Sequence, residues 1–243
     1  MSKQPPGENA ASFAPERDDV FNRIARRYDV LCDLFSLGIH RLWKRRMVAR
    51  IAAENWGTML DAAGGTGDIT LRLLKRQPEL APRITLSDLS PAMLAMAKGK
   101  LDAMGLQPAV RVLNAEDMPD VPDASVDLYA ISLALKICDR ARIMREAVRV
   151  LRPGGIFIAL EASAIQMAWL HRLYLAYMGA CMPVIGWIAT GGDASAYRYL
   201  LRGVNEFPNA EALALELHEA GFEAVTFELM TLGIVAIHSG RKP

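Results

Sequence analysis

The sequence predicts an α/β protein whose core is a doubly wound, mostly parallel β-sheet. From about residue 57 onward, short apolar runs alternate with helical patterns, which is typical of a parallel sheet with helices on both faces. Residues 20–55 precede these runs and have the periodicity of amphipathic helices. The domain therefore divides into helices at 20–55, a core at 57–162, an apolar insertion at 163–206, and a closing helix and hairpin at 207–243.

The strands and helices of the core alternate in order. Five runs predict parallel strands at 58–63, 83–88, 109–114, 125–132 and 155–162. Helical patterns lie between them at 68–76, 91–104 and 140–151. Ser90 is a typical N-cap, Pro91 is a typical first helical residue, and the Pro-Gly-Gly at 153–155 ends the third helix. A helix at 209–220 then leads to a hairpin of two runs, 222–230 and 233–240, which brings the strand count to seven.

The composition favours one globular domain. With 243 residues, 52% hydrophobic residues and a formal net charge of +1, the chain resembles neither a disordered protein nor one that coats nucleic acid. Residues 1–19 lack the apolar run of a signal peptide and predict a flexible lead-in to a single domain at 20–243. We therefore expect a cytoplasmic protein without a nucleic-acid partner. We also expect no metal, because no ligand spacing links the cysteines and histidines, which are Cys32, Cys138, Cys181, His40, His171, His218 and His238.

The insertion is unusually apolar. Residues 173–190 contain no charged side chain over 18 residues, about the minimum for a membrane-spanning helix. Gly179, Pro183 and Gly186 interrupt this stretch, so we expect a bent pair of helices that covers an apolar pocket. A dimer interface or plain core is the alternative.

The stretch LDAAGGTGDIT at 60–70 joins the first strand to the first core helix. A dinucleotide fingerprint needs a glycine where Thr70 stands, and a phosphate loop needs a lysine that is missing. Asp61 would repel a pyrophosphate but attract a cationic amino-acid end. S-adenosylmethionine has such an end and no phosphate, and glycines let the backbone approach it closely. The turn therefore favours S-adenosylmethionine over a nicotinamide cofactor.

Polar residues follow the next strands at the same edge of the sheet. Asp88 ends the second strand, where a carboxylate can accept hydrogen bonds from both ribose hydroxyls. Asn114, Ala115 and Glu116 end the third, where a small residue between two polar ones suits an adenine edge, and Ser132 ends the fourth. Each residue alone is a common cap or turn residue, but four successive strand ends favour one cofactor site.

Several segments together resemble the ubiquinone/menaquinone biosynthesis C-methyltransferase family: VFNRIARRYDVLCDLFSLGIHRLWKR, LDAAGGTGDIT, SDLSPAML, LNAEDMP, RVLRPGG, LEAS, AYRYL and TLGIVAIHSG. These are class I enzymes that use S-adenosylmethionine to methylate a ring carbon of a polyprenylated quinol. The resemblance runs from about Val20 to the C-terminus and implies a seven-stranded Rossmann-like sheet with an antiparallel C-terminal strand. It implies cofactor contacts at Asp61, Gly64, Gly65, Thr66, Gly67, Asp88, Asn114, Ala115 and Ser132.

The departures from the family pattern fall on the expected substrate side. After the fourth strand, where a glycine, an arginine and an asparagine are usual, this chain has Ala134, Lys136 and no asparagine. Further departures are Cys32, Ala162, Arg202 and Gly203. They favour an altered quinol as the acceptor. The alternatives are another phenolic or small natural-product acceptor, or a non-catalytic member that binds cofactor or lipid as an assembly partner.

Methylation of a phenolic ring carbon needs a base for the phenol and a group that stabilises the phenolate. Lys136 follows the apolar run AISLAL and is the candidate stabiliser, although a solvent-facing lysine is the alternative. By resemblance, Tyr28, Asp33 and Tyr197 are candidates for orienting or deprotonating the acceptor, with core tyrosines as the alternative.

A prenylated acceptor resides in a bilayer, so we expect the protein to contact the inner face of the membrane peripherally. The segment 165–190 would form a lid and wall for the isoprenoid tail. A homodimer or a quinone-synthesis complex is compatible with this expectation. Basic residues of the amino-terminal helices would meet anionic lipid, unless they form a solvated face: Arg41, Lys44, Arg45, Arg46 and Arg50.

Overall fold

The computed structural model describes residue 25, residues 28–190, residue 204 and residues 207–243. The described chain contains a seven-stranded sheet with the order β3-β2-β1-β4-β5-β7-β6. All strand pairs are parallel except those of β7, which runs antiparallel to both of its neighbours. The predicted fold class and the closing hairpin are therefore confirmed. The strands are β1 Met59–Ala62, β2 Ile84–Asp88, β3 Ala109–Val112, β4 Val126–Ser132, β5 Leu151–Ala162, β6 Glu223–Met230 and β7 Val235–Arg241.

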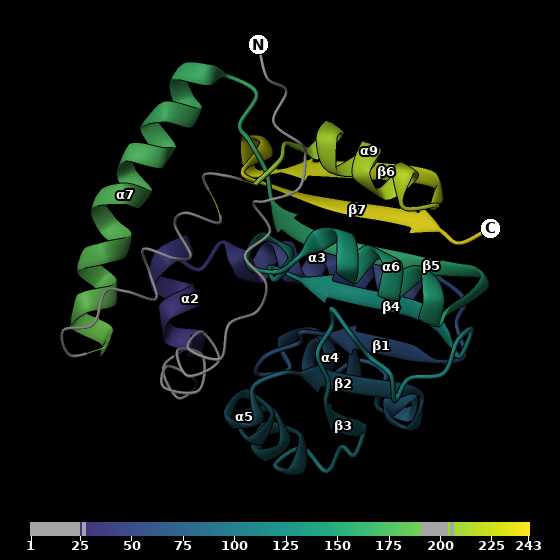
Figure 1. The fold of residues 1–243 in the computed structure, drawn as a ribbon. Helices are drawn as coiled ribbons and strands as arrows, with labels where there is room; N and C mark the ends of the chain where they lie inside the picture. Colours follow the sequence, from purple (N-terminus) through teal and green to yellow (C-terminus); the bar gives the residue numbers. More distant parts are fainter. Residues whose placement is uncertain (1–24, 26–27, 191–203, 205–206) are drawn as a thin grey trace.

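Helices cover both faces of the sheet (Figure 1). Successive residues of a strand point to opposite faces, so Leu128 joins one hydrophobic cluster and Tyr129 joins the other. The first cluster lies against α3, α4 and α5, and the second lies against α6 and α9. The helices are α2 Tyr28–Ser36, α3 His40–Ala53, α4 Asp68–Leu74, α5 Pro91–Asp102, α6 Arg140–Val150, α7 Ala168–Thr190 and α9 Ala210–Glu219, with short 3₁₀ turns at η2 Pro78–Arg83, η3 Leu135–Ile137 and η4 Thr231–Gly233.

Local signals placed most helix starts correctly. The Ser90 hydroxyl accepts a hydrogen bond from the Met93 backbone N–H at 3.2 Å, as expected of an N-cap. Asn209 caps α9 in the same way through Ala212, at 2.8 Å. Ordinary capping chemistry therefore fixes where α5 and α9 begin.

Among the parallel strands, two boundaries differ from the prediction by more than one residue. β3 ends at Val112 rather than at Asn114, because Asn114 turns back to form an isolated bridge with Asp117. β5 begins at Leu151, four residues early, and thus includes the Pro-Gly-Gly. The extra residues are accommodated by a register shift, since Val126 pairs with Leu151 but Leu128 pairs with Ile156.

The predicted bent pair of helices at 173–190 was wrong, because α7 is one continuous helix over Ala168–Thr190. A glycine inside a helix costs about 1 kcal/mol and an interior proline about 3 kcal/mol. The helix α7, which packs against α2, is nevertheless continuous. These two helices lie beyond the carboxyl ends of the parallel strands (Figure 1). Within the ranges that the structure describes, no helix has both the length and the apolar character needed to cross a membrane.

Candidate active site

The glycine turn after β1 disfavours side chains, through its backbone conformation at Gly65 and Gly67 and through crowding at Gly64 and Gly67. Gly65 and Gly67 have φ angles of +58° and +78°, in the left-handed region that favours glycine. A Cβ at Gly64 would overlap the buried Leu86 side chain, and one at Gly67 would lie 3.1 Å from Ala97 Cβ. The turn therefore exposes bare backbone at the carboxyl edge of the sheet, as expected of a turn that admits a ligand closely.

Asp88 organises this turn. One carboxylate oxygen accepts a hydrogen bond from the Gly65 N–H at 2.8 Å, and the other accepts one from the Ser90 N–H at 2.8 Å. The end of β2 is thereby tied to the glycine turn and to the start of α5. Asp88 also lines a cleft at this edge, which is the place from which it was predicted to bind a ribose.

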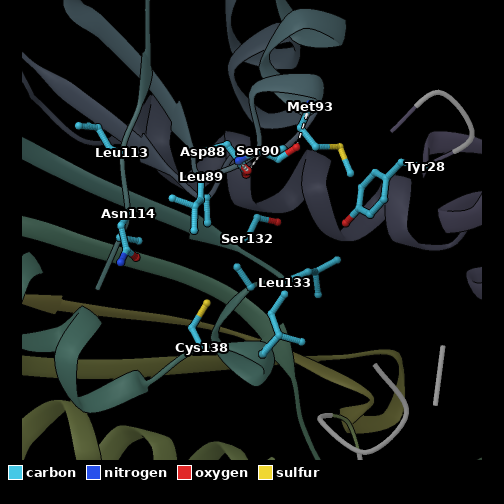
Figure 2. A pocket seen from close by; sticks show the side chains of 15 residues that line it. Tyr28, Asp88, Leu89, Ser90, Met93, Leu113, Asn114, Ser132, Leu133 and Cys138 are labelled. Atoms are coloured by element: carbon cyan, nitrogen blue, oxygen red, sulfur yellow. Dashed lines mark hydrogen bonds between the residues drawn. The ribbon is translucent and has the colours of Figure 1, made fainter. Parts of the chain in front are cut away.

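The cleft brings together most of the predicted cofactor residues. Figure 2 shows Asp88 at its head, Asn114 and Leu113 on one side, Ser132 near its centre and Tyr28 approaching from the opposite side. The Ser132 hydroxyl is buried and has no hydrogen-bond partner within the described residues. A buried hydroxyl that faces a cleft without a partner is costly unless a ligand completes its hydrogen bond. The predicted residues that line the cleft are Gly65, Asp88, Asn114, Ala115 and Ser132.

Asp61 lies behind the glycine turn and is fully buried. Its Oδ2 accepts hydrogen bonds from the Thr70 hydroxyl at 2.6 Å and from the Thr70 N–H at 3.3 Å. Its Oδ1 has no partner within the described residues. Burial raises the pKa of this carboxyl group to about 6. An ammonium group reaching Oδ1 would stabilise the carboxylate and lower this pKa again. Contact between Asp61 and the amino-acid end of the cofactor stays a prediction.

Thr66 has a different environment from the one predicted. Its hydroxyl donates a hydrogen bond to Asp29 of α2 at 2.7 Å, and it does not line the cleft. Lys100 pairs with the second Asp29 oxygen at 2.5 Å and donates to the Thr66 carbonyl at 3.3 Å. These bonds fasten α2 to the glycine turn. A direct contact between Thr66 and the cofactor stays a prediction.

A second cavity of about 330 Å³ adjoins the cleft. Tyr28, Leu133 and Ile137 line both spaces and so separate them. The walls of the second cavity are mainly apolar and come from α2, α3, α7 and η4, with Val204 as a further lining residue. A flat ring in this cavity would lie next to the cofactor cleft.

Lys136 lines this second cavity, and its side chain is only 10% exposed. Its Nζ lies 3.0 Å from Glu161 Oε1 and also donates to the Leu133 carbonyl. Glu161, fully buried in β5, accepts further hydrogen bonds from the Lys136 N–H at 3.3 Å and the Ala162 N–H at 2.7 Å. The solvent-facing alternative for Lys136 is therefore wrong. Sequence reasoning missed Glu161, although an acidic residue inside the apolar run IALEA was an available signal.

Tyr28 lies at the junction of the cleft and the second cavity, where it hydrogen-bonds Cys32. The neighbouring Cys32 and burial hold the pKa of the Tyr28 hydroxyl well above its usual range. Burial also raises the pKa of the Cys32 thiol. Both groups therefore stay protonated at neutral pH and contribute hydrogen bonds rather than charge.

Asp33, another predicted acceptor residue, is not brought into the cavity. Asp33 is held by Arg41 through two hydrogen bonds of 2.7 and 2.5 Å, and it does not line the cavity. The Arg41 guanidinium lowers the pKa of Asp33. Tyr197 lies outside the described residues, as do Arg202 and Gly203.

The residues present fit S-adenosylmethionine. The turn at 64–67 lacks side chains at its glycines, so a ligand can approach its backbone closely. The Asp61 oxygen without a partner among the described residues suits an ammonium group. The Ser132 hydroxyl, also without a partner among them, can bond a ligand. Asp88 lies at the second strand end, as ribose binding requires.

Comparison with known proteins agrees with this geometry. The model of the ubiE/COQ5 methyltransferase family matches residues 12–242. The ubiquinone/menaquinone biosynthesis C-methyltransferase UbiE of Acidiphilium cryptum is 40% identical over 225 residues, which cover 91% of this chain and 88% of that protein. The UbiE protein of Rickettsia akari is 39% identical over 230 residues, covering 93% and 92% of the two chains.

Solved structures agree on the fold. A Thermotoga maritima methyltransferase, described as S-adenosylmethionine-dependent and as a possible histamine N-methyltransferase, superposes with a TM-score of 0.65 at 18% identity, covering 93% of this chain and all of the other. The [4+2]-cyclase SpnF gives a TM-score of 0.68 at 18% identity, covering 98% and 99%. The chain belongs to the ubiE/COQ5 methyltransferase family, and it is an S-adenosylmethionine-dependent methyltransferase.

Proposed function

We propose that this enzyme methylates a ring carbon of a polyprenylated benzoquinol or naphthoquinol in ubiquinone and menaquinone biosynthesis. The single observation that carries the proposal is the apolar cavity of about 330 Å³ beside the cofactor cleft, with the buried cation of Lys136 in its wall. A quinol ring needs apolar walls and a stabilised phenolate oxygen, and this cavity offers both. The relatives named as quinone-biosynthesis C-methyltransferases support the same acceptor class.

The protein's part in the reaction is alignment and electrostatics. S-adenosylmethionine supplies an activated methyl group on a cationic sulfur. Tyr28, Leu133 and Ile137 lie between the two spaces and would set how the acceptor ring approaches the cofactor. The apolar walls exclude water, which strengthens the attraction between Lys136 and a phenolate oxygen.

The isoprenoid tail would leave the cavity along α7. Tyr174, Tyr177 and Met178 of this helix line the cavity. Each methylene of a tail that leaves water contributes about 0.8 kcal/mol to binding. A long apolar helix at the cavity wall is therefore suited to a long apolar tail.

Peripheral contact with the membrane is the finer part of the proposal. Exposed apolar side chains lie on α2, in the turn after it and on α7: Leu34, Leu37, Trp169 and Leu173 are between 48% and 74% exposed. Arg41, Arg45 and Arg46 are exposed on α3. Lys44 does not belong to this basic face, because it is buried and pairs with Asp68 at 2.9 Å.

The alternative acceptor, another phenol, is favoured by one specific observation. Cys32, Lys136 and Ala162, three departures from the family pattern, all line the cavity. They change its shape and hydrogen bonding where the ring would lie. A panel of quinols and simpler phenols, each assayed with the purified enzyme, separates the two acceptor classes.

Genetic complementation tests the proposed function. In a bacterial strain that lacks its quinone C-methyltransferase, this chain should restore methylated quinones, as measured by mass spectrometry of lipid extracts. Restored quinone also excludes the role of a non-catalytic assembly partner. Absence of methylated quinone from cells that contain the folded protein would contradict the quinol assignment.

A further inference from the structure

His40 has an environment that a merely structural histidine does not need. It is the first residue of α3, lines the acceptor cavity and is 6% exposed. In the sequence it has no metal-ligand spacing to another histidine or cysteine. Its neighbours Ser36 and Asp33, both on α2, lie close to one nitrogen of its ring.

Hydrogen bonding fixes the tautomer of the neutral ring. Ser36 Oγ donates its single proton to the Cys32 carbonyl at 2.7 Å. The same oxygen lies 2.7 Å from His40 Nδ1, so the proton in this second bond must come from Nδ1–H. Nε2 then carries the lone pair. Among the described residues Nε2 has no hydrogen-bond partner, and it is not one of their fully enclosed atoms.

The surrounding charges suit a base that accepts a proton and returns it. Burial of the ring is the largest cause that lowers the pKa of His40, and the positive charges of Lys44 and Arg72 lower it further. The negative charges of Asp33 and Asp68 raise the pKa of His40, and Oδ1 of Asp33 lies 3.7 Å from Nδ1 of the ring. The ring is therefore neutral at pH 7. Across the cavity it shares walls with Lys136 of η3 and with the titratable groups Tyr28, Cys32, Tyr174 and Tyr177.

We propose that His40 is the general base that removes the phenolic proton of the acceptor. The phenol O–H bond breaks, an N–H bond forms at Nε2, and the electron pair stays on the oxygen, which Lys136 stabilises. Asp33 stabilises the imidazolium through Nδ1, and the proton leaves to solvent before the next turnover. This assignment rests on the proposed phenolic acceptor.

The other candidates for the base are weaker. Asp33 is held by Arg41 and does not line the cavity. The pKa values of Tyr28 and Cys32 are both raised, so neither side chain is ionised at neutral pH. The amine of Lys136 is held by Glu161 as a cation.

Replacement of His40→Asn tests the proposal. The asparagine amide can still donate to Ser36, but it offers no basic nitrogen. We expect the turnover number to fall by about 10²–10⁴-fold, and the acidic limb of the pH profile, below pH 6.5 in the wild type, to disappear. Calorimetric affinity for S-adenosylmethionine should not change. The matched control is His218→Asn, because the His218 side chain in α9 bonds the Phe222 carbonyl, at 3.2 Å, and does not line the cavity.

Nitrogen NMR of the wild-type histidines gives an answer that does not depend on folding of a variant. We expect His40 to be the Nδ1–H tautomer at pH 7.5, with a pKa below the usual 6.5. An Nε2–H tautomer, or a His40→Asn enzyme with wild-type turnover and an unchanged acidic limb, would overturn the assignment. If the wild type methylates no quinol or phenol, the proposed function fails; if it is active and only these His40 results fail, the base alone is wrong.

Discussion

Lys136 and Glu161 form a buried ion pair, 3.0 Å apart, between the short turn after β4 and the end of β5. The lysine lines the acceptor cavity, and the glutamate is fully buried behind it. The glutamate therefore holds the cation at the wall where a phenolate would develop. This pair links the stability of the sheet edge to the chemistry of the cavity.

Removal of the Lys136 cation should affect the stability of the protein and the turnover of the enzyme differently. Lys136→Met leaves Glu161 buried without its partner, which should lower the free energy of unfolding by about 3–5 kcal/mol. The double variant Lys136→Met/Glu161→Gln removes both charges and should regain most of that stability. Neither variant should recover turnover, because the phenolate is not stabilised. Denaturant unfolding and methylation assays measure the two effects, and a double variant with wild-type turnover would show that the cation is dispensable.

The carboxyl group of Asp61 should make stability depend on pH. Its pKa is about 6 in the folded protein against 3.8 for an ordinary aspartate, so between these pH values the folded state binds more protons than the unfolded state. The free energy of unfolding of the cofactor-free protein should therefore fall as pH rises through this range, by up to about 3 kcal/mol. Asp61→Asn should lose this component. Equal pH dependence in the two proteins, measured by urea unfolding, would show that the carboxyl group is not perturbed.

The glycine turn should tolerate no side chain at Gly64. Gly64→Ala places a methyl group against the buried Leu86 and within 3.2 Å of the Asp61 carboxyl, so we expect a loss of about 1–3 kcal/mol in stability and weaker cofactor binding. Gly99→Ala is the matched control, since a Cβ there meets nothing within 4 Å. It lies inside α5 and should stabilise the protein by about 0.5–1 kcal/mol. Thermal unfolding and calorimetry compare the two, and similar behaviour would refute the close-approach argument.

The orphaned hydroxyl of Ser132 should serve the cofactor rather than the fold. Ser132→Ala removes a buried polar atom that has no partner within the described chain, so the cofactor-free protein should keep or gain stability. Affinity for S-adenosylmethionine should fall about tenfold, the loss of one hydrogen bond. Tyr129→Phe removes a comparable orphaned hydroxyl that does not line the cleft and should leave affinity unchanged. Unchanged affinity in Ser132→Ala would remove Ser132 from the cofactor site.

The order of the elements could be predicted because it depends on local chemistry. Ser90 and Asn209 cap their helices with their own side chains, and the alternation along β4 reports burial on both faces. The end of β3 could not be predicted, since it depends on how Asn114 pairs with Asp117 in a turn. The continuity of α7 and its packing against α2 are not revealed by a local pattern of glycine and proline.

The residues of the cofactor cleft could be predicted more completely than those of the acceptor cavity, because the cavity depends on tertiary contacts. Asp88 and Ser132 stand at successive strand ends, and parallel topology alone brings such residues together. The cavity instead depends on contacts among α2, α3 and η3. The partner of Lys136 lies 25 residues away in Glu161, and the role inferred for His40 depends on a hydroxyl of the preceding helix.

The position of the transferred methyl group tests the central claim most directly. The purified enzyme is incubated with ¹³C-methyl S-adenosylmethionine and a demethylated prenyl quinol in detergent, and the product is examined by carbon NMR. A quinol C-methyltransferase predicts that the label is bonded to a ring carbon and that it is absent from the product of Lys136→Met. Label on a phenolic oxygen, or no labelled quinol at all from folded enzyme that binds the cofactor, would contradict the account.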